Sequence, residues 1–371
     1  MSAGAGALDV ALMSPCYWPE VRRGSERFLH ELSAGLLARG HRPRLITSHP
    51  GLPTWRVEEG MPIVRHWRPP EGWLERRSFD PYLTHAPLSY AALRLGRRAD
   101  VAHAIHPTDA LVAARWARRT GRPAVFSFMG IPDRAAIVGE RLGPRIVARA
   151  LARSSAVVAL SAAAAAAFRQ TVGVDAQVIH PGVDLATFRP GPPRNEAPTV
   201  FCAAALAEPR KRVALLVRAF RLVRRERPDA RLVLSRPRHP DAARAVGAHG
   251  PGIELRDVDD RAELARAYAQ AWVSALPSVG EAFGLVLLEA MACGTPGVGS
   301  NRDGIPEVIS GPQLGRLFEG DNEWMLARAI LEALELAQDP ATAPACRAHA
   351  ETFSAERCTE RYLDLYRGLL G

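Results

Sequence analysis

Two glutamates, Glu281 and Glu289, stand eight positions apart in the segment 277–309, which reads PSVGEAFGLVLLEAMACGTPGVGSNRDGIPEVI. A carboxylate suits vicinal hydroxyl groups because it accepts two hydrogen bonds. Eight residues of helix extend about 12 Å and make slightly more than two turns, so both carboxylates would address one elongated ligand. Either glutamate alone would be ordinary at a helix N-terminus. In this apolar, small-residue context, we interpret the pair as a site for a sugar and a ribose.

The same segment predicts an anion site at the start of a helix near Phe283 and Gly284. A strand is expected to end at Leu276, and a glycine-containing loop separates it from helical spacing. Free backbone N–H groups and the positive end of the helix dipole gather at such a point, which favours a phosphate. Carboxylates that accept hydrogen bonds from hydroxyl groups, together with an anion site, indicate that the ligand is a nucleotide sugar.

Charge is distributed unevenly along the chain, which carries a net charge of +9. Residues 1–190 hold 25 arginines against 15 acidic residues, whereas residues 191–371 hold 23 basic and 24 acidic residues. A basic half attracts phosphorylated ligands, anionic lipid or nucleic acid, although a general abundance of arginine explains it equally well. Lys211 is the only lysine, and a bias toward arginine does not explain why this one remains.

The composition excludes several classes of protein. With 47% hydrophobic and 23% charged residues over 371 positions, the chain is typical of two globular domains. It has no membrane-spanning apolar run and no signal-peptide pattern, and its five scattered cysteines favour a reducing cytoplasm. No metal is expected, because no Cys/His metal spacing occurs and the acidic pair Asp259-Asp260 precedes a helix as a cap. Nucleic-acid binding is disfavoured, since no G-x-G-x-x-G, P-loop or recognition module is present.

The elements that must position the site alternate between strand and helix. Apolar runs predict strands at residues 8–13, 44–47, 101–105, 124–128, 156–160, 177–179, 199–203, 231–234, 273–276 and 297–299. Helical spacing predicts helices at residues 25–39, 110–119, 144–152, 162–170, 213–226, 261–270, 284–292 and 355–370. Residues 50–87, rich in proline and tryptophan, are expected to form loops with short strands. The pattern predicts an α/β protein with doubly wound sheets.

A proline-rich segment is expected to divide the chain. Four prolines fall within residues 190–198, where a regular helix cannot form. We therefore expect an N-terminal Rossmann-like domain at 1–185, a linker at 186–198, a C-terminal Rossmann-like domain at 199–354 and a final helix at 355–371 that packs across the domains. Two such domains would face a cleft, where ligands of these sheets bind.

The segment PSVGEAFGLVLLEAMACGTPGV (277–298) resembles the signature of retaining glycosyltransferases of family 4, P-S-x-x-E-G-F-G-L-x-x-L-E-A-M-A-C-G-T-P-V-V. Two mild departures are Ala282 for glycine and Gly297 for valine. Weaker similarity covers nearly the whole chain, including Gly40-His41, ARSSAVVALS (152–161) and HPGVDLATFRP (180–190). The resemblance implies the two-domain GT-B architecture, with the C-terminal helix crossing back to the N-terminal domain.

This resemblance implies a role for each residue on the donor side, in the C-terminal domain. Glu281 would contact the donor sugar, and Phe283 and Gly284 would present backbone N–H groups to the sugar or diphosphate. Glu289 would bind the ribose hydroxyls. Lys211 occupies the place of the lysine in the family's R-L-x-x-x-K-G pattern, where a compact ammonium neutralises the diphosphate.

Other residues follow from the same resemblance, some of them at departures from the family pattern. The arginine of the lysine motif is missing from AALAEPRKRV (204–213), and Arg210 or Arg212 is expected to replace it. The expected donor-binding residues are Ser278, Arg210, Arg212, Phe283, Gly284, Leu285 and Glu289, beside the catalytic residues Glu281, Lys211 and His106.

The acceptor side, in the N-terminal domain, departs further. The first loop reads VRRGSE, with Gly24 in place of adjacent glycines and Arg23 beside it. Arg23 would meet a phosphate or an acidic acceptor, and the alternative that it only faces water stays open. Met129, followed by Gly130, stands where many relatives have a histidine, and methionine cannot shuttle a proton. His103 and His106 lie near the same place, and we expect His106 to touch ligand.

The implied reaction is transfer of a hexose-type sugar, with retention and without metal or cofactor, from a nucleotide-diphosphate sugar to a hydroxyl acceptor. The departing phosphate would help to take the acceptor proton, so the enzyme would tolerate a methionine, Met129, where many relatives have a histidine. A nucleotide-sugar epimerase of GT-B fold and an inactive relative that only binds nucleotide sugar stay open. The acceptor is also open: tryptophan-rich loops and a basic half suit an enzyme peripheral to the inner, anionic face of a membrane that modifies a lipid carrier, and equally a cytoplasmic enzyme for a glycan or small-molecule alcohol.

Overall fold

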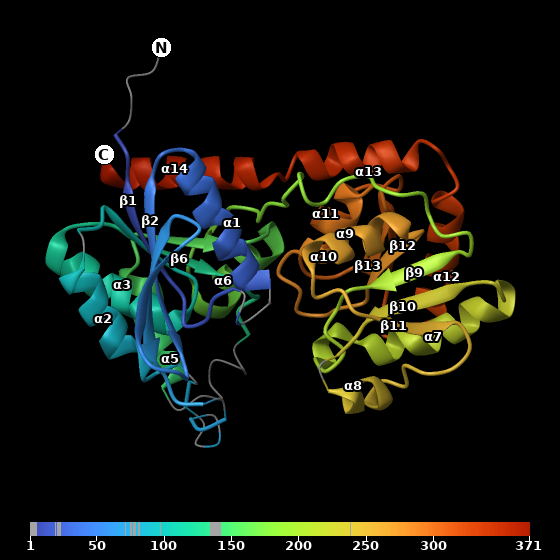
Figure 1. Ribbon diagram of the computed structural model, residues 1–371, viewed down its shortest axis with the longest axis horizontal. Coiled ribbons are helices and arrows are strands. Elements are labelled where there is room, and N and C mark those ends of the chain that lie inside the picture. The colour runs from blue at the N-terminus through green and yellow to red at the C-terminus, as the bar shows by residue number, and fades with distance from the viewer. Residues whose placement is uncertain are drawn as a thin grey trace, which may run out of the picture. The chain divides into compact units, whose positions relative to one another are not determined.

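The computed structural model describes residues 6–371 except residues 19, 21–23, 71, 75, 77–78, 81, 97, 134–141 and 238. The chain divides into two compact units. The first unit combines Met1–Pro181 with Ala355–Gly371, and the second is Gly182–Ser354. Figure 1 shows the first unit in blue to green, together with the red helix α14, and the second unit in yellow-green to red. The C-terminal helix therefore belongs to the fold of the first unit.

The first unit is built on a sheet that, within the described residues, has eight strands in the order β3-β4-β2-β1-β5-β6-β7-β8. All neighbours pair in parallel except the hairpin β3–β4. The strands are β1 (Asp9–Met13), β2 (Arg42–His49), β3 (Thr54–Glu58), β4 (Met61–Trp67), β5 (Val101–Ala104), β6 (Ala124–Phe128), β7 (Ala156–Ala159) and β8 (Gln177–Val178).

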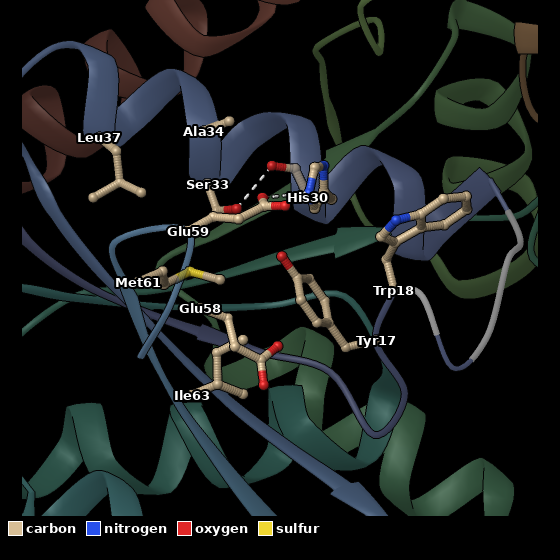
Figure 2. Close-up of a pocket in the computed structure, with 10 residues that line it drawn as sticks. All are labelled: Tyr17, Trp18, His30, Ser33, Ala34, Leu37, Glu58, Glu59, Met61 and Ile63. Atoms are coloured by element: carbon tan, nitrogen blue, oxygen red, sulfur yellow. Dashed lines mark hydrogen bonds and ion pairs between the residues drawn. The ribbon is translucent and has the colours of Figure 1, made fainter. Parts of the chain in front are cut away.

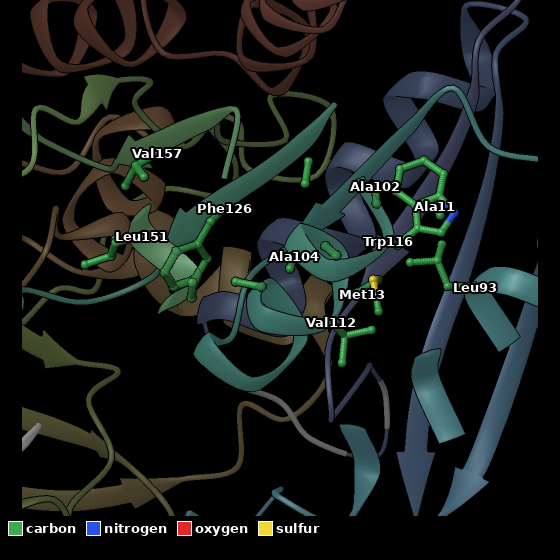
Figure 3. Packing of buried hydrophobic residues seen from close by; sticks show 14 of the residues in the cluster. Ala11, Met13, Leu93, Ala102, Ala104, Val112, Trp116, Phe126, Leu151 and Val157 are labelled. Atoms are coloured by element: carbon green, nitrogen blue, oxygen red, sulfur yellow. The ribbon is translucent and has the colours of Figure 1, made fainter. Parts of the chain in front are cut away.

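Helices cover both faces of this sheet. They are α1 (Gly24–Ala38), α2 (His85–Leu95), α3 (Pro107–Thr120), α5 (Gly143–Arg153), α6 (Ala162–Val172) and α14 (Ala355–Leu370). One core joins the sheet to α2, α3, α5 and α6, with Trp116 and Phe126 among its large side chains (Figure 3). The other core joins the opposite face to α1 and α14 through Phe28 and Tyr362. Because strand side chains alternate between the faces, continuous apolar strands supply both cores.

The second unit is a parallel sheet with the order β11-β10-β9-β12-β13-β14 and helices around it. Its strands are β9 (Thr199–Cys202), β10 (Arg231–Ser235), β11 (Ile253–Arg256), β12 (Val273–Leu276), β13 (Gly297–Ser300) and β14 (Gly315–Phe318). Its helices are the 3-10 turn η2 (Pro209–Lys211), α7 (Val213–Glu226), α8 (Pro240–Ala245), α9 (Arg261–Gln270), α10 (Leu285–Ala292), α11 (Ile305–Val308), α12 (Glu323–Leu336) and α13 (Thr342–Glu351).

The α/β class predicted from the sequence is confirmed. Every strand and helix expected from periodicity is present, and α7, α9, β12 and α14 have the predicted bounds. Asp260 caps α9 as expected, accepting from the backbone N–H groups of Ala262 and Glu263 at 2.8 and 3.1 Å.

Residues 50–87 contain the expected short strands, β3 and β4, although their pairing as a hairpin was not predicted. The sequence also did not predict α2, α8, β11 or the elements between residue 300 and α14. The hairpin strands are too short for a periodic run, whereas α12 has helical spacing, with Leu326, Ile330 and Ala333 buried, that the predictions from sequence missed.

The segment 186–198, expected to act as a linker, packs along the second unit. Arg194 donates hydrogen bonds to the carbonyl groups of Ala337 and Gly294, and the indole N–H of Trp272 donates to the Asn195 carbonyl at 2.8 Å. Prolines prevent a helix here, but they do not prevent an extended chain from being held by arginine and tryptophan side chains.

Candidate functional site

Each sheet has a point where the chain reverses the direction in which strands are added. In the second unit, β9 is followed outward by β10 and β11, and β12 then pairs with the other side of β9. The loops after β9 and β12 therefore begin side by side at the carboxyl edge of the sheet. In the first unit, β1 and β5 stand in the same relation. Ligands of doubly wound sheets bind at such points.

Lys211 and Glu281 meet at the reversal point of the second unit. Lys211 ends η2, in the connection after β9, and Glu281 lies in the loop after β12. The Lys211 ammonium donates to Glu281 Oε2 at 2.6 Å, and the side chains are only 13% and 16% exposed. Charges in such a partly buried position interact more strongly than an exposed pair.

The loop that carries Glu281 is fastened to the loop after the next strand, β13. The backbone N–H of Gly280 donates to Asp303 Oδ2 at 2.7 Å, and the N–H of Gly304 donates to the Glu281 carbonyl at 2.9 Å. At Gly304, an added Cβ would lie 2.3 Å from the carbonyl oxygen of Ala282. Only glycine allows this close approach. The hydrogen bonds of Gly280 and of the Glu281 carbonyl therefore fix the backbone of the loop that carries Glu281.

The helix after this loop has a glycine at its N-cap, so the N-cap residue offers no side chain to the N–H groups of the first turn. Helix α10 begins at Leu285, and its N-cap residue Gly284 has φ 108°, a conformation that favours glycine. Phe283 is buried and packs against Phe353 with ring centroids 5.5 Å apart. The helix N-terminus that the predicted anion site requires is therefore present. Because Phe283 is buried, the backbone that leads into α10 is fixed.

The helix predicted at residues 284–292 is present as α10, so the two-turn spacing between Glu281 and Glu289, which would hold only if residues 281–289 were all helical, does not apply. Glu281 precedes α10 in the loop, and only Glu289 lies on the helix. The two-turn spacing therefore does not relate the carboxylates. Their relation comes from the loop, whose backbone is set by the contacts of Gly280 and Gly304 described above.

Glu289 is the deeper of the two carboxylates, with 2% exposure. The hydroxyl of Tyr268, on α9, donates to its Oε2 at 3.2 Å. Burial raises the pKa of the nearby Cys293 thiol to about 12, and the Glu289 charge adds to this effect. Since a buried carboxylate requires hydrogen-bond donors, Tyr268 is a functional candidate that the sequence reasoning missed.

The two arginines beside Lys211 differ in their contacts. Arg210 is half-exposed, and its guanidinium lies 2.9 Å from Glu208 Oε2 and 3.6 Å from Glu281 Oε2. Arg212 is 13% exposed, pairs with Asp321 at 2.7 Å and adopts the uncommon φ of 54° at the start of α7. Arg210 is therefore the arginine that belongs to the Lys211–Glu281 cluster, whereas Arg212 is held by a separate carboxylate.

Two further predicted donor-side residues flank this cluster. Ser278 is fully buried, and its hydroxyl finds no hydrogen-bond partner in the part of the chain that the structure describes. Its carbonyl accepts from the Ser300 hydroxyl at 2.6 Å, which adds another tie between the loops after β12 and β13. Leu285 is the first residue of α10, so its backbone N–H lies in the first turn, which follows the glycine N-cap.

The predicted acceptor-side residues follow strands of the first unit. Gly24 begins α1 and is exposed, whereas Arg23 lies outside the described residues. Met129 and Gly130 follow β6, and Met129 packs partly against the core beneath α1 and α14. His106 follows β5 and is the N-cap of α3, where its Nδ1 lies 2.8 Å from Thr108 Oγ1. The edge at the β1–β5 reversal point therefore carries the first loop and His106.

His103, the other histidine near this edge, is fully buried. Its Nδ1 lies 2.6 Å from the Tyr366 hydroxyl and its Nε2 lies 2.8 Å from the Ser127 hydroxyl. Burial lowers the pKa of His103 to about 3. Nδ1 connects β5 to Tyr366 of α14, and Nε2 connects it to Ser127 of the neighbouring strand β6, so His103 is a structural residue.

A small pocket, absent from the sequence predictions, lies between α1 and the β3–β4 hairpin (Figure 2). Its volume is about 220 Å³, and Tyr17, Trp18 and His30 contribute rings to its wall. His30 Nε2 lies 2.9 Å from Glu59 Oε2, and burial raises the pKa of Tyr17 to about 12. The hairpin supplies the acidic wall, so the pocket could be found only once that hairpin was known.

Among the described residues, no group of three or more His, Cys, Asp and Glu side chains is arranged to hold a metal ion. The same part of the chain contains no helix that is both long and apolar enough to span a bilayer.

Two family models match the chain and together cover most of it. Residues 22–187 match the model described as Glycosyltransferase Family 4, and residues 197–336 match the model described as Glycosyl transferases group 1. The boundary between the matches falls near the N-terminal end of the second unit.

Similar curated proteins include two D-inositol 3-phosphate glycosyltransferases. The one from Catenulispora acidiphila is 31% identical over 313 residues, which are 73% of this chain and 72% of that protein. The one from Mycobacterium marinum is 34% identical over 219 residues, 52% of this chain, and the match spans only 45% of that protein's length.

Solved structures match nearly the whole chain at lower identity. Sucrose-phosphate synthase from Thermosynechococcus elongatus has a TM-score of 0.80 and 20% identity, covering 98% of this chain and 99% of that one. HepE from Anabaena, in complex with UDP-glucose, has a TM-score of 0.73 and 18% identity, covering 97% and 100%. At these identities the likeness concerns the fold.

Proposed function

Because the chain belongs to the glycosyltransferases of family 4, with their GT-B fold, we propose that it transfers a hexose-type sugar, with retention and without a metal, from a nucleotide-diphosphate sugar to a hydroxyl acceptor. The observation that carries this proposal is the Lys211–Glu281 pair beside the N-terminus of α10. The loops at this place are joined by hydrogen bonds. They bring together a cation, Lys211, a carboxylate that accepts hydrogen bonds from hydroxyl groups, Glu281, and an anion site at the N-terminus of α10.

On the donor side, each group has a chemical task. Lys211 and Arg210 neutralise the diphosphate, assisted by the first-turn N–H groups of α10. Glu281 accepts hydrogen bonds from sugar hydroxyls. Glu289, held by Tyr268, binds the ribose hydroxyls. These interactions stabilise the negative charge that develops on the departing diphosphate, which is an electrostatic form of catalysis.

In the transfer step, the bond between the anomeric carbon and the phosphate oxygen breaks while the acceptor oxygen bonds to the same carbon on the same face. The acceptor proton passes to the departing phosphate oxygen, so atoms and charge balance without a protein base. Met129 has no proton to exchange, and this route does not require one there. Positive charge from Lys211 and Arg210 takes the electrostatic place that a metal ion would otherwise fill at the diphosphate.

The acceptor is a hydroxyl compound, and a polyol phosphate is the first to test because two relatives are named for D-inositol 3-phosphate. The UDP-glucose bound by the similar structure HepE makes UDP-hexoses the first donors to test. A GT-B epimerase would convert the donor sugar without an acceptor, and an inactive relative would bind the donor without turnover. Both alternatives are outcomes of the same assay.

The test is a panel of nucleotide-diphosphate sugars incubated with the protein, with and without acceptor alcohols, while released nucleoside diphosphate is measured. We expect acceptor-dependent release that Glu281→Gln and Lys211→Met each abolish or strongly reduce. Asp241→Asn, at an exposed ion pair of the same unit, is the matched control and should not change turnover. Absence of turnover with every donor, or turnover that survives both changes, would overturn the proposal.

Two finer parts of the proposal have their own measurements. The anomeric proton coupling of the product, measured by NMR, reports retention or inversion. Activity after treatment with a chelator reports whether a metal is needed. An inverted product or a chelator-sensitive enzyme would contradict that part alone and leave transferase activity standing.

A further inference from the structure

The β3–β4 hairpin has two different faces because its side chains alternate. Glu58, Met61 and Ile63 point to the α1 side, where they line the pocket of Figure 2. Trp55 pairs across the strands with Val64, and Val57 pairs with Pro62, on the opposite side. This second face is apolar, and we call it, together with the end of α2, the hairpin groove.

The hairpin groove is incompletely covered by the rest of the first unit. Helix α2 packs on β2 and β4, yet Trp55 is 69% exposed and Val57 57% exposed. Leu95, the last residue of α2, is 83% exposed. Trp55 and Leu95 line a cavity of about 770 Å³, whose apolar wall also includes Val64 and Ala92. An exposed apolar surface with a cavity of this kind marks an interaction site.

Arginine surrounds the apolar wall. Arg42, Arg44 and Arg98 line the cavity, and Asp9 is its one acidic lining residue. Arg42 pairs with Asp9 at 2.8 Å, and Arg44 donates to the Leu93 carbonyl at 3.3 Å, while Arg98 is exposed. Three guanidinium groups against one carboxylate leave the groove positively charged, within a sequence half that has ten more arginines than acidic residues.

This combination selects the partner by its chemistry. Tryptophan and leucine side chains at the surface suit the boundary between headgroups and acyl chains, and guanidinium groups bind phosphate. An acidic water-soluble ligand would use the charge but would leave Trp55 and Leu95 in water. A neutral apolar partner would leave the arginines without counter-charges. An anionic phospholipid surface satisfies both.

We propose that the hairpin groove docks this protein on an anionic phospholipid bilayer. Trp55 and Leu95 enter the headgroup region, and Arg98 and Arg42 contact lipid phosphates. The attraction has an apolar part and an electrostatic part, so it weakens as salt screens the charges. Docking of this kind is independent of the transfer chemistry and needs no lipid substrate.

The test is co-sedimentation of the full-length protein with vesicles of phosphatidylcholine alone and of phosphatidylcholine mixed with phosphatidylglycerol. We expect binding to the anionic vesicles at low salt, and loss of binding at high salt. The double change Trp55→Ala with Leu95→Ser should lower the partition coefficient at least about tenfold, from the apolar area removed. Arg98→Gln should lower it about fivefold.

Trp324→Ala is the matched control, since Trp324 is 61% exposed on α12 of the second unit. It should bind anionic vesicles as the unchanged protein does, and circular dichroism should show that all variants fold. Lack of binding to anionic vesicles at low salt would overturn the proposal, as would binding that the double change leaves intact or that Trp324→Ala weakens equally. Lipid-free self-association lost in the double variant, without vesicle binding, would assign the groove to a second copy instead. None of these readouts requires turnover, so they are separate from the test of the proposed function.

Discussion

The only lysine of the chain, Lys211, donates a 2.6 Å hydrogen bond to Glu281, the glutamate proposed to hold the donor sugar. Each group therefore neutralises the other. A nucleotide-diphosphate sugar offers phosphate to the ammonium and hydroxyl groups to the carboxylate. Binding would exchange one internal ion pair for two contacts with the ligand, and the two residues can be tested separately.

Glu281→Gln should separate diphosphate binding from sugar transfer. Loss of the carboxylate releases Lys211 from its partner, so free nucleoside diphosphate should bind at least as tightly as before. The sugar loses its hydrogen-bond acceptor, and kcat/KM should fall on the order of 10²–10³-fold. Lys211→Met should weaken nucleoside diphosphate binding instead. Calorimetry measures the affinities and nucleotide release measures turnover. Equal weakening of diphosphate binding by both changes would contradict this division.

Gly304→Ala should displace the loop that carries Glu281. The new Cβ would lie 2.3 Å from the Ala282 carbonyl oxygen, and its next neighbours, in Ala282 and Phe283, are also backbone atoms, so no side chain can move aside to relieve the clash. We expect a loss of about 1–3 kcal/mol in unfolding free energy and a fall in turnover larger than the fall in stability explains. The control is Gly368→Ala, where an added Cβ has no neighbour within 4 Å. Urea denaturation and nucleotide release are measured on both variants, and full activity of Gly304→Ala would argue against a fixed loop.

Tyr268→Phe should report on the buried carboxylate of Glu289. The change removes the hydroxyl that donates to Glu289 Oε2 at 3.2 Å while it keeps the ring, which packs against Phe201 and Phe188. A hydrogen bond to a charged group contributes about 1.5–3 kcal/mol. We therefore expect KM for the nucleotide sugar to rise about tenfold or more, with kcat changed less. The reverse pattern, a lower kcat at constant KM, would place Glu289 away from the nucleotide.

Sequence patterns were sufficient for the α/β framework because apolar strands and amphipathic helices have strong periods of their own. They also indicated Lys211 and Glu281, since one is unique and the other lies in a specific motif. The meeting of these residues depends on the strand order β9-β12, which places two distant loops at one edge. The helical spacing between Glu281 and Glu289 does not describe their relation, because Glu281 precedes the helix that carries Glu289.

Other features had no local signal at all. Tyr268 contacts Glu289 from a helix 21 positions earlier, and no motif marks it. The alternation in TWRVE (54–58) is short, and its central residues Trp55, Arg56 and Val57 are exposed on both faces, so it did not predict the hairpin. The hairpin groove needs Trp55 from that hairpin and Leu95 from α2, two elements whose proximity is determined only by the folded sheet.

Acidification should destabilise the first unit through its buried histidines. Burial lowers the pKa of His103 to about 3, and burial together with the neighbouring His85 lowers the pKa of His66 to about 4, both below the ordinary value of 6.5. Between these folded-state values and about pH 6.5, the unfolded chain binds protons that the folded chain does not. The contribution of these two histidines to the unfolding free energy should therefore be constant near pH 7 and above. It should fall as the pH drops from about 6.5 toward 4. The slope is up to about 1.4 kcal/mol per pH unit for each histidine.

His103→Gln should flatten this pH dependence, because glutamine does not titrate. The same change weakens the contacts with the Tyr366 and Ser127 hydroxyls at pH 7, so the slope and not the absolute stability is the readout. His239→Gln, at an exposed position of the second unit, is the control and should keep the slope. Urea unfolding between pH 4 and pH 7 provides the measurement. An unchanged slope in His103→Gln would show that the ring does not remain neutral inside the fold, and would place the acid sensitivity elsewhere.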